Sequence, residues 1–203
     1  MKNQQIFLAS QSPRRRILVE QLGIHYQVVK VAVDESHRAG ESAVDYVARM
    51  ALEKAHAGWQ QVAAQGMPVL GADTCIVLNG KIVGKPDDRD HGIALLKQYS
   101  GNTHQVLTGV AMVGQLKGTA EAKPEQLIRI NTSHVTFCTL SDRECEQYWD
   151  SGEPLGKAGG YAIQGKAAAF IKTIEGSYSA IMGLPLYELA QLLAEFGIHW
   201  LDE

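Results

Sequence analysis

The chain has 203 residues, of which 45% are hydrophobic and 20% are charged, and its formal net charge is −3. This length and composition predict one globular domain over residues 1–203, with enough apolar residues for a substantial core. The slightly negative charge argues against a general nucleic-acid-binding protein, and no apolar run approaches the ~18 residues that a membrane-spanning helix needs.

Apolar periodicity and turn residues predict strands and helices along the whole chain. In chain order we expect a strand at residues 6–9, a helix at 13–22, a strand at 25–33, a helix at 42–63, a strand in two pieces at 69–72 and 75–78, a strand at 81–83, a helix at 88–99, strands at 106–113 and 127–140, a helix at 141–149, a strand at 168–174 and a helix at 185–196. Asn79-Gly80 predicts a hairpin turn, and Ser141 with Glu144 predicts a capping box. Because strands and helices do not alternate strictly, we expect an α/β fold on a long, twisted, mixed sheet in one bilobed domain.

The helix at residues 13–22 begins in an unusual way. Its first turn contains three consecutive arginines, although the unpaired N–H groups and the positive end of the helix dipole favour acidic side chains there. Arg14 and Arg15 make sense if a phosphate binds at this spot. Alternatively, Ser12 caps the helix, Pro13 occupies its first position and the arginines point into solvent. The segment alone favours neither interpretation.

Acidic residues at two positions are candidates for catalysis. Asp73 interrupts an apolar strand pattern, where a charge is costly unless it is paired or functional. Its simpler interpretation is an aspartate bonded to local backbone N–H groups at a strand bend. Asp34 and Glu35 follow a predicted strand, where α/β folds usually have ligand sites, although a solvated acidic turn is simpler. Two converging carboxylates would suit Mg²⁺ or Mn²⁺, with waters and substrate phosphates completing the shell.

Several lysines could complement these carboxylates. Lys85 follows a hairpin and is restrained by the next residue, a proline, whereas Lys54 has the pattern of an ordinary surface lysine. Lys157 and Lys166 lie in or beside the glycine-rich passage at residues 156–165. Together with the two arginines, such cations would suit a triphosphate.

Other motifs are weaker or absent. Residues 160–167 come within one position of a Walker A loop, but Ala167 replaces the hydroxyl that binds Mg²⁺, and a strand is predicted to follow instead of a helix. The seven histidines show no metal-ligand spacing, and no Ser/His/Asp set is visible. The three cysteines form no C-x-x-C pair, so we expect no structural zinc site. Their odd number suggests reduced thiols in a cytoplasmic protein. The first residues contain too few apolar side chains for a signal peptide, so none is expected.

Eight short motifs are spread over nearly the whole chain. They are Leu-Ala-Ser-Gln-Ser-Pro-Arg-Arg (8–15), Glu-Lys-Ala (53–55), Gly-Ala-Asp-Thr (71–74), Gly-Lys-Pro (84–86), Ser-Gly-Asn-Thr-His (100–104), Lys-Ala-Gly-Gly-Tyr-Ala-Ile-Gln-Gly (157–165), Gly-Ser-Tyr (176–178) and Gly-Leu-Pro-Leu (183–186). In this order the set resembles the Maf family of nucleoside triphosphate pyrophosphatases. The resemblance implies a fold akin to the inosine triphosphatases, with a long twisted mixed sheet, flanking helices and two lobes around a central cleft. It also implies metal-dependent hydrolysis of a nucleoside triphosphate to the monophosphate and pyrophosphate.

The resemblance also implies roles for the matching positions. Asp73 would be the general base and, with Glu35, would hold a divalent cation, which could be Mg²⁺, Mn²⁺ or Co²⁺. The phosphate-binding residues would be Ser10, Arg14, Arg15, Lys54 and Lys85. The residues that select the base would be Arg14, Thr74 and Gln164, and all three match the dTTP/UTP branch. The sister branch, which acts on 7-methyl-GTP, has an aromatic residue at the position of Arg14. At the positions of Thr74 and Gln164 it has residues other than threonine and glutamine.

The choice of the pyrimidine branch has a physical basis. A glutamine side chain offers both a donor and an acceptor, which the hydrogen-bonding edge of uracil or thymine requires. The alternatives are a 7-methyl-GTP pyrophosphatase or a nucleotide-binding regulator of cell division, and the intact acidic and basic set argues against the latter. The resemblance further suggests a homodimer. Residues 115–129 look longer than usual for the family, and we expect a surface hairpin tip without catalytic importance.

Overall fold

The computed structural model describes residues 5–116 and 123–201. The tip of the expected 115–129 hairpin therefore falls largely outside the described residues. In chain order the elements, with 3₁₀ helices written η, are β1 (Gln5–Leu8), α1 (Pro13–Gln21), β2 (His25–Val28), α2 (Ala43–Val62), η1 (Ala63–Gln65), β3 (Val69–Leu78), β4 (Lys81–Val83), α3 (Arg89–Tyr99), β5 (Thr103–Gly114), β6 (Glu125–Phe137), α4 (Asp142–Asp150), η2 (Ala158–Gly160), η3 (Lys166–Phe170), β7 (Ile171–Glu175), α5 (Tyr178–Met182) and α6 (Leu186–Glu195).

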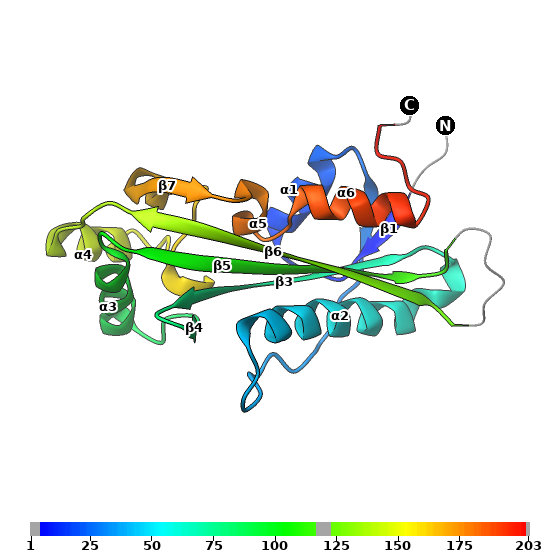
Figure 1. Cartoon of the computed structure of the whole chain (residues 1–203), viewed down its shortest axis with the longest axis horizontal. Coiled ribbons are helices and arrows are strands. Elements are labelled where there is room, and N and C mark those ends of the chain that lie inside the picture. Colours follow the sequence, from blue (N-terminus) through cyan, green and yellow to red (C-terminus); the bar gives the residue numbers. More distant parts are fainter. Residues whose placement is uncertain (1–4, 117–122, 202–203) are drawn as a thin grey trace.

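The strands form one seven-stranded mixed sheet in the order β2-β1-β3-β5-β6-β7, with β4 paired to β3 (Figure 1). β1 pairs in parallel with β2 and β3, and the remaining pairs are antiparallel. β3, β5 and β6 are much longer than the others and run side by side along the molecule. The expected α/β fold on a long mixed sheet is confirmed. No helix among the described residues is both long and apolar enough to cross a membrane.

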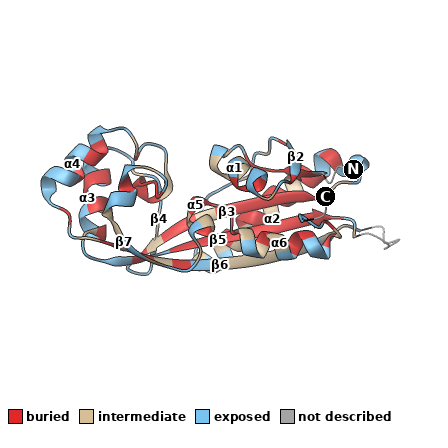
Figure 2. Cartoon of the chain, turned by 90° about the horizontal axis from the view of Figure 1, so that it is seen from above, coloured by how far each residue is buried: buried red, intermediate tan, exposed pale blue. Residues whose placement is uncertain are grey.

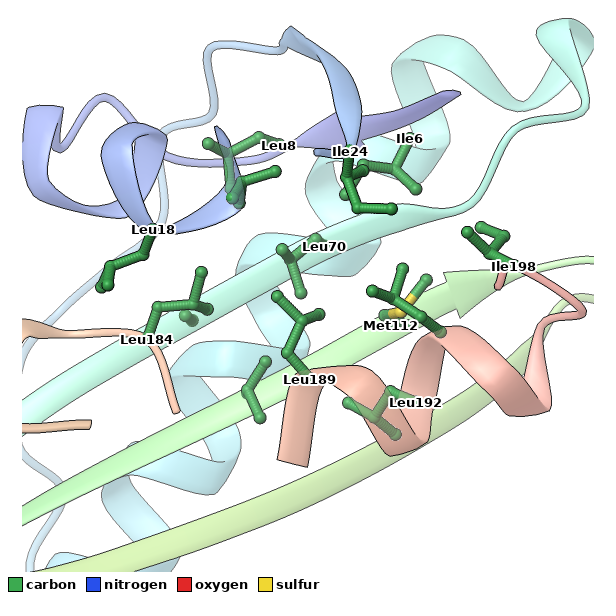
Figure 3. Packing of buried hydrophobic residues seen from close by; sticks show 14 of the residues in the cluster. Ile6, Leu8, Leu18, Ile24, Leu70, Met112, Leu184, Leu189, Leu192 and Ile198 are labelled. Carbon is green, nitrogen blue, oxygen red and sulfur yellow. The ribbon is translucent and has the colours of Figure 1, made fainter. Parts of the chain in front are cut away.

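Helices divide the molecule into the two expected lobes (Figure 2). One lobe has α1 and α6 on one face of the sheet, where apolar side chains of both helices meet those of β1, β3 and β5 (Figure 3). On the opposite face, α2 covers a second apolar cluster of the same lobe. In the other lobe, α3 and α4 enclose a separate core with the far ends of β3, β5 and β6. The long strands thus contribute to the cores of both lobes.

The close approach of α2 to the sheet depends on two glycines. A β-carbon at Gly71 of β3 would lie 2.3 Å from the carbonyl oxygen of Ala51, and one at Gly109 of β5 would lie 2.4 Å from that of Val47. No side chain can occupy such positions unless the helix moves away from the sheet. Gly109 is also the register partner of Asp73, so α2 lies directly against the part of β3 that carries the candidate catalytic carboxylate.

Several expected elements differ from the structure. The strand expected at residues 127–140 is β6, which ends at Phe137. β3 continues unbroken through Asp73 because β5 pairs with it along its length. β2 ends at Val28, so the segment at residues 29–33 is not a strand. The apolar run that starts at Ala168 lies in η3, and strand pairing with β6 begins only at Ile171. The short helix α5 was not predicted. A short apolar run does not reveal which segments will find a pairing partner.

Candidate active site

A pocket of about 490 Å³ is lined by residues of both lobes. On one side α1 contributes Arg14 and Arg15, and on the other the segment between η2 and η3 contributes Gln164. Between them, the centre of β3 contributes Asp73 and Thr74. Because this pocket collects most of the predicted functional residues from distant parts of the sequence, it is our candidate active site.

Lys54 brings the two candidate carboxylates together. Its Nζ atom lies 2.6 Å from Glu35 Oε1 and 2.7 Å from Asp73 Oδ1. Lys54 and Asp73 are each 8% exposed, whereas the Glu35 side chain is 56% exposed. The hydrogen bond from Lys54 lowers the pKa of Glu35 and outweighs the opposing effect of burial. The expectation that Lys54 is an ordinary surface lysine is wrong: α2 turns this side chain toward β3, where two negative partners offset the cost of burying an ammonium.

The segment that carries Glu35 has no regular structure. Besides the ion pairs of Lys54 with Glu35 and of Glu53 with Arg38, two side chains of α2 bind its backbone. The Tyr46 hydroxyl donates to the carbonyl oxygen of Glu35 over 3.1 Å, and Arg49 Nη2 donates to that of Ser36 over 3.0 Å. Arg49 also forms a 2.5 Å ion pair with Glu41, at the end of the segment. Sequence analysis missed these contacts, because the periodicity of α2 does not reveal that an external loop covers this face.

Arg15 is a cation with neutral partners only. Its Nε donates to the carbonyl oxygen of Gly183 over 2.7 Å, Nη1 to Ser10 Oγ over 3.2 Å and Nη2 to Thr74 Oγ1 over 3.4 Å. Burial lowers the pKa of Arg15, and the negative charge of Asp73 opposes that effect. Since none of these partners carries a charge, the guanidinium is positioned to attract an anion into the pocket.

The start of α1 directs Arg14 and Arg15 to the pocket. Ser12 occupies the N-cap position and Pro13 follows it, but the Ser12 side chain makes no capping hydrogen bond. Instead, Ser10 Oγ accepts a hydrogen bond from the backbone N–H of Ser12 over 3.2 Å as well as one from Arg15. Ser10 is buried and supports Arg15 from outside the pocket lining. Arg14 does line the pocket.

Thr74 belongs to a chain of oriented hydroxyl groups. Thr108 Oγ1 donates to the carbonyl oxygen of Ala180 over 2.8 Å and lies 2.9 Å from Thr74 Oγ1. Because the single proton of Thr108 is used on Ala180, the Thr74 hydroxyl must donate to Thr108, which leaves its lone pair to accept from Arg15. The side chain of Thr74 is therefore fixed in orientation at the edge of the pocket.

The other predicted cations are divided between the pocket and its surroundings. Lys85 and Lys157 line the pocket, although Lys157 Nζ donates to the carbonyl oxygen of Glu153. Lys166 lies outside the pocket lining, so its proposed part in triphosphate binding is not supported. Gln164 lines the pocket and is exposed there. Lys85, Arg14 and Arg15 thus line the same pocket as the two carboxylates.

The acidic residues form a pair and not a larger cluster. Among the residues that the structure describes, no group of three or more His, Cys, Asp or Glu side chains comes together in a way that could hold a metal ion. Asp73 and Glu35 nevertheless direct carboxylate oxygens at one point, which the Lys54 ammonium occupies. Hard oxygen ligands of this kind suit Mg²⁺ or Mn²⁺, which keep several waters and substrate phosphates in their shells.

Comparison with known proteins gives consistent matches. A family model described as Maf-like protein matches residues 5–196. The dTTP/UTP pyrophosphatase of Alkalilimnicola ehrlichii is 49% identical over 203 residues, with 96% of each chain covered. That of Chromobacterium violaceum is 48% identical over 197 residues, covering 95% of this chain and 94% of the relative. Among solved structures, the Staphylococcus aureus Ham1 protein matches 66% of this chain and 72% of its own with 17% identity, but its TM-score of 0.38 is too low to carry an argument.

Proposed function

The chain belongs to the Maf family, and we propose that it hydrolyses dTTP and UTP to the nucleoside monophosphate and pyrophosphate. The observation that carries the proposal is the pocket in which Asp73 and Glu35 meet opposite the cationic side chains of Arg14, Arg15 and Lys85. Negative and positive groups arranged in this way are what a metal-assisted attack on a triphosphate requires.

In the proposed reaction, Asp73 acts as general base. It would accept a proton from the water that attacks the α-phosphorus, and pyrophosphate would leave with the electrons of the broken anhydride bond. Asp73 is suited to this because β3 holds it in the sheet and Lys54 holds one carboxylate oxygen, Oδ1. The guanidinium of Arg15 would bind phosphate oxygens whose charge increases as the bond breaks.

Asp73 and Glu35 are also the residues that would hold a divalent cation. A bound cation would neutralise phosphate charge and polarise the phosphorus, as it does in other phosphoryl-transfer enzymes. Lys54 would continue to bind both carboxylates through its ammonium group. It maintains their convergence in the protein alone, where two unshielded carboxylates would repel one another.

Base selection would fall to Gln164, Thr74 and Arg14. The Gln164 amide can donate to one carbonyl of uracil or thymine and accept from the adjacent N–H. A purine would leave such groups unpaired, and an unpaired buried group is a strong source of discrimination. We expect the enzyme to act in the cytoplasm, where thiols stay reduced, because Cys75, Cys138 and Cys145 are all free.

The proposal is tested by pyrophosphate release from purified protein. The panel should contain dTTP, UTP, 7-methyl-GTP and ATP, each with Mg²⁺, Mn²⁺, Co²⁺ or a chelator. We expect turnover of dTTP and UTP that the chelator abolishes. Turnover of neither pyrimidine nucleotide would overturn the proposed function, and faster turnover of 7-methyl-GTP would assign the chain to the sister activity.

A substitution tests the role of Asp73. Asp73→Asn should lower kcat by ~10²–10⁴-fold while nucleotide binding persists, because the amide cannot accept the proton. Asp150→Asn is a matched control, since that carboxylate is 57% exposed and pairs with Arg89 outside the pocket. A kcat for Asp73→Asn equal to that of the control would show that Asp73 is not the base.

A further inference from the structure

The segment that presents Gln164 is held from behind by one tyrosine. The Tyr148 hydroxyl of α4 accepts a hydrogen bond from the backbone N–H of Ala162 over 3.2 Å and donates one to Glu153 Oε1 over 2.8 Å. Tyr148 is 3% exposed, so its hydroxyl is removed from water. The contact with Ala162 lies two residues before Gln164.

Glu153 holds the same segment on the other side of Gln164. Its carboxylate accepts hydrogen bonds from the backbone N–H of Lys166 over 2.8 Å and from that of Ala167 over 3.2 Å. A β-carbon at Gly165 would lie 2.4 Å from the Glu153 carboxyl group, so only glycine lets the backbone approach so closely. Tyr148 and Glu153, which we call the brace, thus bind backbone N–H groups on both sides of Gln164 and also bind each other.

The electrostatics of the brace agree with this geometry. Burial by itself would raise the pKa of Glu153, but the hydrogen bonds from Lys166, Tyr148 and Ala167 lower it below its usual value. The carboxylate therefore stays charged at neutral pH, and charge-assisted hydrogen bonds are stronger than neutral ones. Gln164 itself is exposed in the pocket, and a turn hydrogen bond from the Gly165 N–H to the carbonyl oxygen of Ala162 over 3.0 Å closes the backbone around it.

From this arrangement we propose that Tyr148 and Glu153 are positioning residues that set the nucleobase selectivity of the enzyme by fixing the backbone on both sides of Gln164. The inference rests on the proposed function and deepens it. Neither residue lines the pocket itself, so neither is expected to contact substrate. Selectivity by hydrogen bonding needs donor and acceptor within a few tenths of an ångström, and a loosely held glutamine could satisfy a purine almost as well as a pyrimidine.

The decisive comparison is between two tyrosine-to-phenylalanine variants. Tyr148→Phe removes the hydroxyl of the brace. Tyr99→Phe is the matched control: Tyr99 is fully buried in the same lobe, and within the described part of the chain its hydroxyl has no hydrogen-bond partner. With Mg²⁺ present, kcat/KM for UTP and for ATP should be measured for each variant. We expect the UTP-to-ATP ratio to fall about tenfold in Tyr148→Phe, since the loss of one buried hydrogen bond has an effect of that order, and to stay at the wild-type value in Tyr99→Phe.

A double-mutant cycle separates positioning from general stability. If Tyr148 acts through Gln164, then adding Tyr148→Phe to Gln164→Ala should change the UTP-to-ATP ratio by less than twofold, because the residue being positioned is gone. A purely structural role would lower both activities equally in either background. Glu153→Gln keeps the shape and one acceptor oxygen, so it should lose less selectivity than Glu153→Ala.

The outcomes distinguish this inference from the proposed function. An active, UTP-selective wild type with an unchanged ratio in Tyr148→Phe would overturn the inference alone. A wild type without activity toward any triphosphate would overturn both. Should Tyr148→Phe fail to fold, Glu153→Gln carries the same test, and faster amide hydrogen exchange at Ala162 and Ala167 relative to Tyr99→Phe is the expected physical signature of a released segment.

Discussion

His104 of β5 is expected to make the protein less stable in mild acid. The side chain is 2% exposed, its Nε2 lies 2.7 Å from the Tyr161 hydroxyl, and within the described residues its Nδ1 has no hydrogen-bond partner. The aromatic rings of Tyr99 and Phe137 pack against it. Because this apolar surrounding disfavours the imidazolium ion, burial lowers the pKa of His104 to about 4.

The sign and size of the effect follow from linkage. In the unfolded chain a histidine titrates near pH 6.5, so between pH 6.5 and 4 the unfolded state binds more protons than the folded one. The free energy of unfolding therefore falls as the pH drops through this window and is unaffected by His104 above it. For a pKa that moves from 6.5 to about 4, the loss between pH 7.5 and pH 4.5 is about 2.5 kcal/mol.

Urea denaturation of the wild type and of His104→Gln at both pH values tests this. Glutamine stays neutral and can still bond to Tyr161, while the other titrating groups contribute equally to both proteins and cancel in the difference. We expect the variant to gain about 2.5 kcal/mol relative to the wild type on going from pH 7.5 to pH 4.5. A relative change below about 1 kcal/mol would refute the argument that burial keeps His104 neutral.

Three further substitutions test the site and its support. Gln164→Glu should lower kcat/KM for UTP by about tenfold or more relative to ATP in a pyrophosphate-release assay, since a carboxylate cannot donate to a pyrimidine carbonyl. Gly71→Ala should lower the free energy of unfolding by about 3 kcal/mol in urea, because the added methyl meets helix backbone, whereas Gly84→Ala, which meets nothing within 4 Å, should change it little. Arg49→Gln should lower kcat about tenfold with a smaller effect on KM, because the segment carrying Glu35 loses the bonds from Arg49 to Ser36 and Glu41, and equal kinetics in wild type and variant would contradict that role.

Much of the local structure could be predicted from the sequence because helix ends depend on nearby residues. Ser141 and Glu144 form the expected capping box, and Ser42 and Asp88 cap α2 and α3 within one residue of the predicted starts. Strand ends were less accurate, as β2 and β7 show, because a strand extends only as far as its partner does.

Most residues of the candidate site could be predicted from the sequence, but the contacts between them could not. The charge in a strand pattern singled out Asp73, and the arginines at a helix start singled out Arg14 and Arg15, since each departs from a local preference, although the sequence also allowed a backbone-bonded aspartate and solvated arginines. No local rule is violated by Lys54, whose pattern is that of a surface residue. Its burial between two carboxylates arises from the contact between α2 and β3, which sequence periodicity does not specify.

The α/β character, the caps and turns, and the set of charged groups follow from the amino-acid sequence, because these features depend on residues within a turn or two of one another. Which of those charges meet depends on the packing of distant elements. Asp73, Lys54 and Glu35 come together because Gly71 and Gly109 let α2 lie against the sheet, and Gln164 lines the same pocket from a segment that Tyr148 and Glu153 bind in the other lobe. Contacts between residues so far apart in the chain depend on the packing of whole elements, and that packing is not encoded in any short segment.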